Sequence, residues 1–260
     1  MDGSLRRLAG YVNLELQTPK EERFHRIYKG SHSARQDRAI LHLYDLTASD
    51  DKNAETKARR AFEAIHRLQL FSWAPRILNS YQEAPGYSGE MFFFTVVDSA
   101  APCIGERKFD NLWDTTSRLA FARSAVCALA ELHGTQVDGN PIIHRNISPN
   151  TILVRHDNTP ILTGFDLAKI PADMSVASSG APVEGWESTV APEVRSQGLV
   201  AADTRSDIYA LCSSLRGLFV GKTDHASECM VEELEKGMSE QPEVRISLEN
   251  LEAAMSIIAR

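Results

Sequence analysis

The sequence has no apolar run long enough to span a bilayer. The longest apolar stretches, such as residues 91–97, fall far short of the ~20 residues that a transmembrane helix needs. The N-terminal segment MDGSLRRLAG also lacks the apolar core of a signal peptide. We therefore expect a cytoplasmic protein that is not exported.

An excess of basic residues is also missing. Lys and Arg number 28 against 35 Asp and Glu, which gives a formal net charge of -7 and a sequence pI of about 5.6. This balance argues against nucleic acid or an anionic membrane as the main partner. The 43% hydrophobic and 24% charged residues are typical of a globular chain.

Cysteine is scarce, and none of the four cysteines has the spacing of a metal site. They are Cys103, Cys127, Cys212 and Cys229. We expect reduced, buried thiols, and the sequence predicts no bound metal.

What the sequence does contain is a change of pattern near residue 100. Before it, alternating and β-branched segments predict five strands, with one helix after the third. The expected strands are residues 11–16, 24–29, 38–46, 76–82 and 90–98, and the helix is residues 54–70. Beyond residue 100 the 3.6-residue period dominates and predicts helices at 116–133, 207–219 and 226–259, the last interrupted near Pro242.

Motifs in the second part carry a family resemblance. The segment HRNISPNTILV, which begins at His144, resembles the catalytic loop of protein kinases, with the pattern H-R-D-x-x-x-x-N before a short strand. GFD follows at 164–166, where kinases have the magnesium-binding D-F-G. APE follows at 191–193, as at the end of a kinase activation segment. Five motifs in the right order, including the two below, are far more specific than any one of them alone.

Two further residues complete this resemblance. Asp207, in SDIYALCSSL, is similar to the aspartate that braces the kinase catalytic loop. Arg245, in PEVRISLENL, is similar to the arginine that pairs with the A-P-E glutamate, here Glu193. The resemblance implies an α+β, two-lobed protein-kinase-like fold. Residues 1–99 would form a five-stranded antiparallel lobe with one helix, and residues 100–260 a mainly helical lobe.

The positions that do chemistry in kinases are changed. Asn146 stands where the catalytic aspartate is expected, and an amide cannot take up a proton at neutral pH. Loss of general-base help slows a reaction roughly 10²–10⁴-fold. Gly164 stands in place of the magnesium aspartate, and His42 in place of the phosphate-binding lysine. Histidine is shorter than lysine and mostly neutral at pH 7.

The expected nucleotide pocket is degenerate elsewhere too. Ile40 replaces the small residue that roofs the adenine, and Glu63 is the helix glutamate left without a lysine. The connection at residues 17–25 contains no glycine, whereas the family has G-x-G-x-x-G for close approach to the phosphates. Asn150 is assigned to the asparagine that binds magnesium in kinases, here with a role in holding the loop.

Two alternatives remain open on the loop that contains Gly164. Asp166 either reaches a metal in place of the lost carboxylate, or it caps the following turn or pairs with Arg145. Arg145 in active kinases meets a phosphorylated residue, for which the possible sites are Ser175, Ser178, Ser179, Ser188 and Thr189. Because Ser and Thr are common in exposed loops, we expect them to be ordinary loop residues.

The resemblance, together with these changed positions, therefore predicts a pseudokinase, which is a regulatory or interaction module with a protein partner. We expect this module to have no cofactor or metal and not to bind ATP. The loop HRNISPNTILV is also similar to kinase-like domains of large bacterial phage-defence proteins, and we expect a bacterial origin. The chain is expected to be either a domain of a longer protein or a minimal stand-alone pseudokinase. The alternative is an atypical serine/threonine kinase, or an ATP-binding sensor, that uses Asn150 and Asp166.

Overall fold

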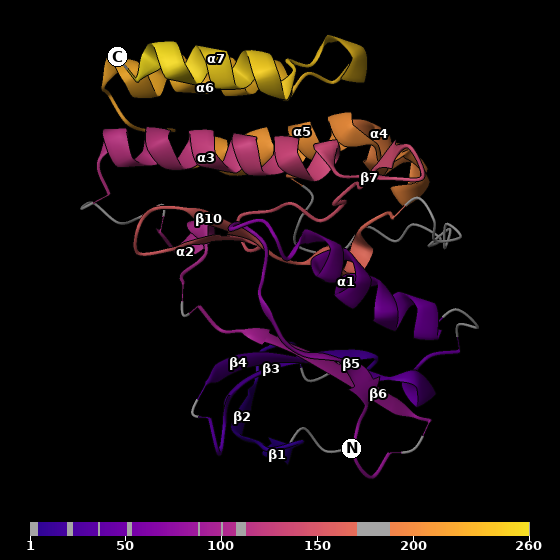
Figure 1. The fold of residues 1–260 in the computed structure, drawn as a ribbon. Helices are drawn as coiled ribbons and strands as arrows, with labels where there is room; N and C mark the ends of the chain where they lie inside the picture. Colours follow the sequence, from indigo (N-terminus) through magenta and orange to yellow (C-terminus); the bar gives the residue numbers. More distant parts are fainter. Residues whose placement is uncertain are drawn as a thin grey trace. The chain divides into compact units, whose positions relative to one another are not determined.

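The computed structural model describes residues 5–19, 23–35, 37–50, 54–87, 89–99, 101–107, 113–170 and 188–259 (Figure 1). Its internal contacts divide the chain into two units, Met1–Ala100 (unit 1) and Ala101–Arg260 (unit 2). Among the described residues, no helix combines the length and the apolar character needed to cross a membrane.

Unit 1 is built on an antiparallel sheet of six strands in the order β1-β2-β3-β4-β6-β5. The strands are β1 (Arg7–Leu8), β2 (Tyr11–Leu16), β3 (His25–His32), β4 (Arg38–Asp45), β5 (Ile77–Glu83) and β6 (Met91–Val97). The prediction of five strands was wrong by one. The extra strand, β1, has only two residues, which is too short for an alternating pattern to reveal it.

The two faces of this sheet have different contents. Because side chains alternate along a strand, Leu41 and Leu43 of β4 lie in a buried core, while His42 and Tyr44 face the other side. The core on the first face contains Leu8, Tyr11, Leu14, Tyr28, Ala39, Leu41, Leu43, Ala84, Met91 and Phe93. The second face carries stacked aromatic rings, described below.

After β4 the chain forms a short 3-10 helix, η1 (Leu46–Ala48), and then the longer helix α1 (Ala54–Leu68). Helix α1 contacts β5. Its buried apolar residues recur at helical spacing: Ala54, Ala58, Ala61, Ala64, Ile65 and Leu68. Phe62 of α1 lies against Phe94 of β6, with ring centroids 5.8 Å apart, so α1 covers the aromatic face of the sheet.

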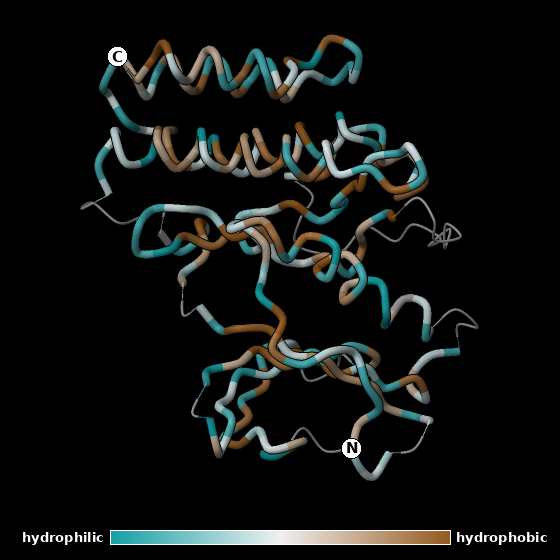
Figure 2. Tube along the Cα trace, viewed as in Figure 1, coloured by the Kyte–Doolittle hydropathy of each residue, from teal (hydrophilic) through white to brown (hydrophobic). Residues whose placement is uncertain are grey.

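Unit 2 is mainly helical (Figure 1). Its longer helices are α3 (Thr115–Gly134), α5 (Thr204–Arg216), α6 (His225–Gly237) and α7 (Leu248–Ile258), and its shorter ones are α2 (Ile104–Arg107), α4 (Pro192–Gln197), η2 (Phe165–Leu167), η3 (Leu199–Ala201) and η4 (Pro242–Val244). Two small hairpins pair β7 (Gln136–Val137) with β8 (Asn140–Pro141), and β9 (Ile152–Val154) with β10 (Pro160–Leu162). Hydrophobic and hydrophilic residues alternate along the helices (Figure 2), as expected for helices that are buried on one side.

Capping residues fix where these helices begin. Asp203 accepts hydrogen bonds from the backbone N–H groups of Arg205 and Ser206, and the Ser206 hydroxyl accepts one from the Asp203 N–H. This capping box starts α5 at Thr204, three residues before the predicted start. Asp114, Asp224 and Ser247 cap α3, α6 and α7, each through a side-chain oxygen that accepts one backbone N–H of the first turn.

A close contact joins α5 to α6. A Cβ atom added to Gly237 would overlap the sulfur of Cys212, so only glycine fits at that point of α6. All four cysteines are free thiols, but Cys212 alone among them is buried, and the expectation of buried thiols was wrong for the other three. Burial raises the pKa of the Cys212 thiol to about 12, which keeps it protonated.

Candidate functional site

A buried carboxylate holds the loop that follows His144. Asp207, 1% exposed near the start of α5, accepts hydrogen bonds from the backbone N–H groups of His144 (2.7 Å) and Arg145 (2.9 Å). The Nε2 atom of His133 lies 3.0 Å from the same carboxylate. A buried charge is tolerated only when it is well paired, so this set of contacts fixes the loop in one conformation. The brace expected from the sequence is present.

The side chain of His144 belongs to this rigid frame. Its ring lies 4.5 Å from that of Phe165, and its Nδ1 accepts the backbone N–H of Asn146 at 3.2 Å. Burial lowers the pKa of His144 to about 4, so the ring is neutral at pH 7. Arg145 takes a left-handed backbone conformation, with φ of 64°, which is uncommon away from glycine and is held here by Asp207.

Asn146 and Gly164, the two changed catalytic positions, contact each other directly. The Asn146 side-chain amide donates a hydrogen bond to the Gly164 carbonyl at 2.9 Å. A Cβ atom at position 164 would lie 2.9 Å from the Asn146 Nδ2 and 2.8 Å from the Thr151 Cγ2. Gly164 also has a φ of 82°, a conformation that favours glycine. The side chains of Asn146 and Thr151 thus occupy the space that a carboxylate-bearing side chain at position 164 would need.

The structure corrects the assignment of Asn150. Its side chain is exposed and lies near Cys103, whose sulfur is 3.8 Å from the Asn150 Oδ1. Thr151, not Asn150, is buried beside Gly164. The signal was in the sequence, because the pattern H-R-D-x-x-x-x-N places the asparagine five positions after Asn146, which is Thr151.

The hydroxyl of Thr151 is already committed to the loop. It donates to the Asn146 carbonyl at 2.8 Å and accepts the backbone N–H of Ser148 at 2.9 Å. In kinases the corresponding asparagine is a magnesium ligand. Thr151 therefore stabilises the turn after Asn146 through bonds that a metal ligand would have to give up.

Asp166 lies half-buried in the first turn of η2. The residue at the N-cap of this turn is Gly164, so Asp166 lies inside η2, and a capping role toward the turn that follows it stays a prediction. A metal-binding role for this carboxylate, and a pairing with Arg145, stay predictions.

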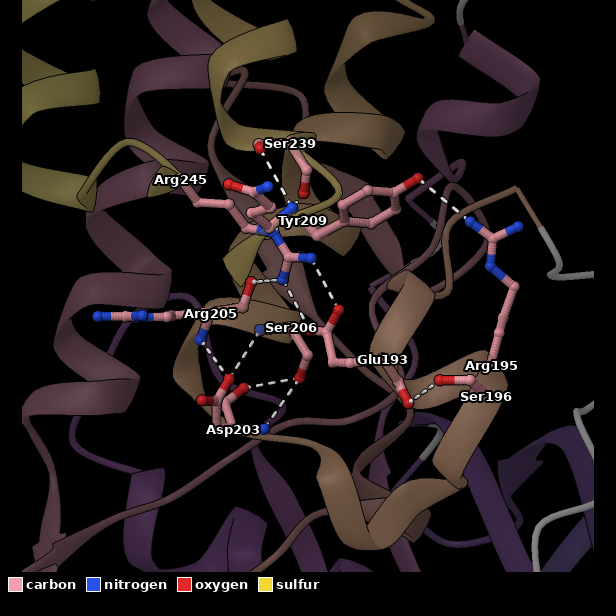
Figure 3. A network of polar contacts seen from close by, with 10 residues as sticks. Glu193, Arg195, Ser196, Asp203, Arg205, Ser206, Tyr209, Ser239 and Arg245 are labelled. Carbon is pink, nitrogen blue, oxygen red and sulfur yellow. Dashed lines mark hydrogen bonds and ion pairs between the residues drawn. The ribbon is translucent and has the colours of Figure 1, made fainter. Parts of the chain in front are cut away.

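The ion pair expected between Glu193 and Arg245 is present (Figure 3). Both terminal nitrogens of Arg245 donate to the Glu193 carboxylate, each at 2.7 Å. Arg245 also donates to the carbonyls of Ser239 (2.8 Å) and Arg205 (3.1 Å), and its side chain is 0% exposed. This bidentate pair ties α4 to α5 and to the segment around η4.

Tyr209 extends this network. The guanidinium of Arg245 lies 5.0 Å from the Tyr209 ring centroid, within cation–π range. The Tyr209 hydroxyl accepts a hydrogen bond from Arg195 at 3.4 Å (Figure 3). Burial alone would raise the pKa of Glu193, but the bonds from Arg245, together with a backbone hydrogen bond and the charges of Arg245 and Arg195, lower that pKa overall. The network keeps Glu193 charged.

In unit 1, His42 lies within a stack of aromatic rings. Its ring is 4.6 Å from Phe94 and nearly parallel to it, and its Nδ1 is 3.1 Å from the Nε2 of His25. Ile40 lies half-buried on the same face of β4. The imidazole at the position of the kinase lysine is therefore held by its neighbours on the sheet.

Glu63 of α1 forms an ion pair with Arg67, one turn along the same helix, at 3.0 Å. Both side chains are about one-third exposed, so this is a surface pair of small energetic weight. In the connection between β2 and β3, residues 20–22 lie outside the described residues, as do Ser175, Ser178 and Ser179. Ser188 is exposed, whereas Thr189 is 4% exposed and so poorly placed for modification.

The changed positions limit the chemistry of unit 2. A kinase needs carboxylate and amide oxygens to hold magnesium, and a carboxylate to orient the attacking hydroxyl. At the three corresponding positions this chain has an amide (Asn146), a hydroxyl (Thr151) and a hydrogen atom (Gly164), and the first two donate to backbone carbonyls. These groups carry no charge to offset that of a hard cation.

Comparison with known proteins agrees with the motifs. No family model matches the chain. It is 28% identical over 214 residues to serine/threonine-protein kinase CDG1 of Arabidopsis thaliana, and the matched region covers 80% of this chain and 46% of the relative. It is 25% identical over 203 residues to serine/threonine-protein kinase PknH of Mycobacterium tuberculosis, and the matched region covers 78% of this chain and 30% of the relative.

The chain spans less than half the length of these curated relatives. A bacterial origin stays a prediction, because the relatives come from a plant and from mycobacteria. At low identity, the chain is thus similar to proteins named as serine/threonine kinases, in agreement with its motifs and its antiparallel sheet.

Proposed function

We propose that this chain is a catalytically inactive kinase-like domain that acts as a regulatory or interaction module. The observation that carries the proposal is the contact between Asn146 and Gly164, in which the amide donates to the backbone carbonyl at 2.9 Å. This contact lies at position 164, where kinases have the aspartate that binds magnesium. Thr151, whose side chain also lies against Gly164, supports the same interpretation.

The scaffold around these residues is retained, which favours a folded module over a decaying enzyme. Asp207 still braces the loop, and Glu193 still pairs with Arg245. Such contacts stabilise one conformation of unit 2 without needing a nucleotide. A module of this kind binds a protein partner through its surface, and we propose a protein partner in the cytoplasm.

The second candidate is an atypical serine/threonine kinase or nucleotide sensor. Two observations favour it: Asp166 offers a half-buried carboxylate two residues after Gly164, and the relatives are named as kinases. In this candidate Asp166 binds the metal in place of the missing aspartate. Asn150 has no part in it, because its side chain lies near Cys103.

Thermal unfolding with and without nucleotide separates the two candidates. A ligand at a hundredfold excess over its Kd adds about 2.7 kcal/mol to stability, which raises the melting temperature by several degrees. With millimolar ATP and either Mg²⁺ or Mn²⁺, the inactive module is expected to show no shift. A radiolabel assay with ATP is expected to show no transfer to the chain or to a general protein substrate.

The Asp166→Asn variant is the matched control, because it removes the charge and keeps the shape. A metal-dependent shift in the parent chain that disappears in this variant would support the second candidate. A shift that survives the substitution and needs no metal would indicate nucleotide binding without metal chemistry at Asp166.

A further inference from the structure

Two histidines of unit 1 lie on neighbouring strands of the aromatic face. His25 begins β3, and His42 lies in the middle of β4. In the register of these strands Ile27 is opposite His42, and His25 is opposite Tyr44, so the two histidines are diagonal neighbours on one face. Their side chains therefore meet because the sheet register brings them together.

The two imidazoles are hydrogen-bonded to each other and held in place by other rings. The His25 Nε2 and the His42 Nδ1 are 3.1 Å apart. His25 stacks on Tyr44 with ring centroids 4.3 Å apart and 6° between the planes, and His42 stacks on Phe94 at 4.6 Å and 5°. Both histidines are half-buried. The pair is thus a pre-organised arrangement of two nitrogen ligands.

The spacing of these nitrogens suits a metal ion. Two imidazole nitrogens bound to a tetrahedral zinc at ~2.05 Å lie about 3.3 Å apart. The observed 3.1 Å is within a small side-chain adjustment of that distance. We propose that His25 and His42 together bind one divalent transition-metal ion of the zinc and copper class, with water completing its coordination.

The protonation states allow this binding. In the hydrogen-bonded pair one ring donates its proton to the other ring's lone pair. When the metal binds, the donating ring changes tautomer, so its proton moves through water from the nitrogen that faces the partner to the other nitrogen of the same ring. Each neutral ring then carries its single proton on the nitrogen that faces away, and the pair as a whole neither gains nor loses a proton. Imidazole selects borderline cations and not magnesium, which prefers oxygen ligands and retains its waters.

This site goes beyond the proposed function, because it needs neither ATP nor magnesium. It also gives His42 a ligand of a different kind from the phosphate that the kinase lysine binds. A failed zinc experiment leaves the assignment as an inactive module unchanged, since that assignment is tested by nucleotide.

Calorimetric titration with Zn²⁺ tests the proposal on three ring-preserving variants. His25→Phe and His42→Phe keep an aromatic ring in the stack and remove one nitrogen ligand each. His32→Phe is the matched control, because His32 lies on β3 but packs against Tyr11 and accepts from backbone N–H groups. We expect at least ~10-fold weaker Zn²⁺ binding for the first two variants, the minimum cost even of losing an outer-shell partner, and unchanged binding for the control.

A second pair of metal-ligating groups provides the decisive alternative. On α6 the Cys229 sulfur lies 3.6 Å from the Nε2 of His225. If Cys229→Ala abolishes Zn²⁺ binding while both sheet variants retain it, the proposal is wrong. The imidazole NMR signals of the parent chain give a test that needs no variant: Zn²⁺ should shift those of His25 and His42 first, and shifts confined to other histidines would overturn the proposal.

Discussion

The ion pair between Glu193 and Arg245 is expected to be a major contributor to the stability of unit 2. A double-mutant cycle with Glu193→Gln and Arg245→Met measures it, because each substitution removes a charge and keeps most of the side-chain volume. Each single variant should lose more stability than a surface substitution, and the double variant should lose less than the sum of the two.

The magnitude follows from burial and geometry. Two charge-assisted hydrogen bonds of 2.7 Å join the pair, each worth about 1.5–3 kcal/mol. Removing one partner of a buried pair costs about 3–5 kcal/mol, because the other charge is left without compensation. The Glu193 side chain is 15% exposed and Arg245 is 0% exposed, so stranding Arg245 is the costlier change. We expect about 4 kcal/mol for Glu193→Gln and about 3 kcal/mol for Arg245→Met.

Urea unfolding followed by circular dichroism gives these free energies. The coupling energy of the cycle should be about 2 kcal/mol or more. The pair Arg216 and Glu235, at 2.8 Å but 38% and 52% exposed, is the matched control and should couple by about 0–1 kcal/mol. A coupling for Glu193 and Arg245 that is no larger than that of the control pair would refute the reasoning.

The pair also predicts a dependence on pH. The pKa of Glu193 is lowered in the folded state, since the Arg245 bonds outweigh its burial. Its contribution is therefore complete above the ordinary carboxyl pKa of 4.5 and is lost as the pH falls through the lower folded pKa. The stability difference between the parent chain and Glu193→Gln should shrink in that acidic range and stay constant from pH 6 to 8.

Three other substitutions test the contacts described above. Asp207→Ala should lower the free energy of unfolding by about 3 kcal/mol, because two buried N–H groups lose their acceptor; an unchanged urea midpoint would contradict this. Gly237→Ala should cost about 1–3 kcal/mol through overlap with the Cys212 sulfur, and adding Cys212→Ala should recover most of the loss; no recovery would mean that the overlap is not the cause. Gly164→Asp should cost about 1–3 kcal/mol, with or without Mg²⁺, because its Cβ crowds Asn146; a gain in melting temperature with Mg²⁺ would show that the metal site is still available.

The sequence predicted most of the fold because its patterns are local. β2 was predicted with its observed bounds, and α1 ends two residues before the predicted end. The start of α5 was missed, although the signal of Asp203 followed three residues later by Ser206 was present. No pattern could reveal β1, a two-residue strand that exists only through its pairing with β2.

The candidate site was predicted where it follows the family's framework and missed where it departs from it. Asp207 and the Glu193–Arg245 pair were identified from motif positions, since the same bonds recur wherever those motifs fold. The Asn146 bond to the Gly164 carbonyl depends on the path of the backbone, which a residue pattern does not specify. The role of Thr151 was missed because the asparagine position of the motif was counted one residue too early, at Asn150. The signal itself was present in the sequence.

The mutual fit of Asn146, Thr151 and Gly164 bears on how readily this loop could take on the residue pattern of active kinases. An aspartate restored at 164 alone meets an amide and a methyl group within 3 Å of its Cβ. An aspartate restored at 146 alone loses the amide that donates to the 164 carbonyl and places a carboxylate against it. Each single substitution toward the kinase pattern therefore gives a less stable protein, and reaching that pattern would need several coordinated substitutions.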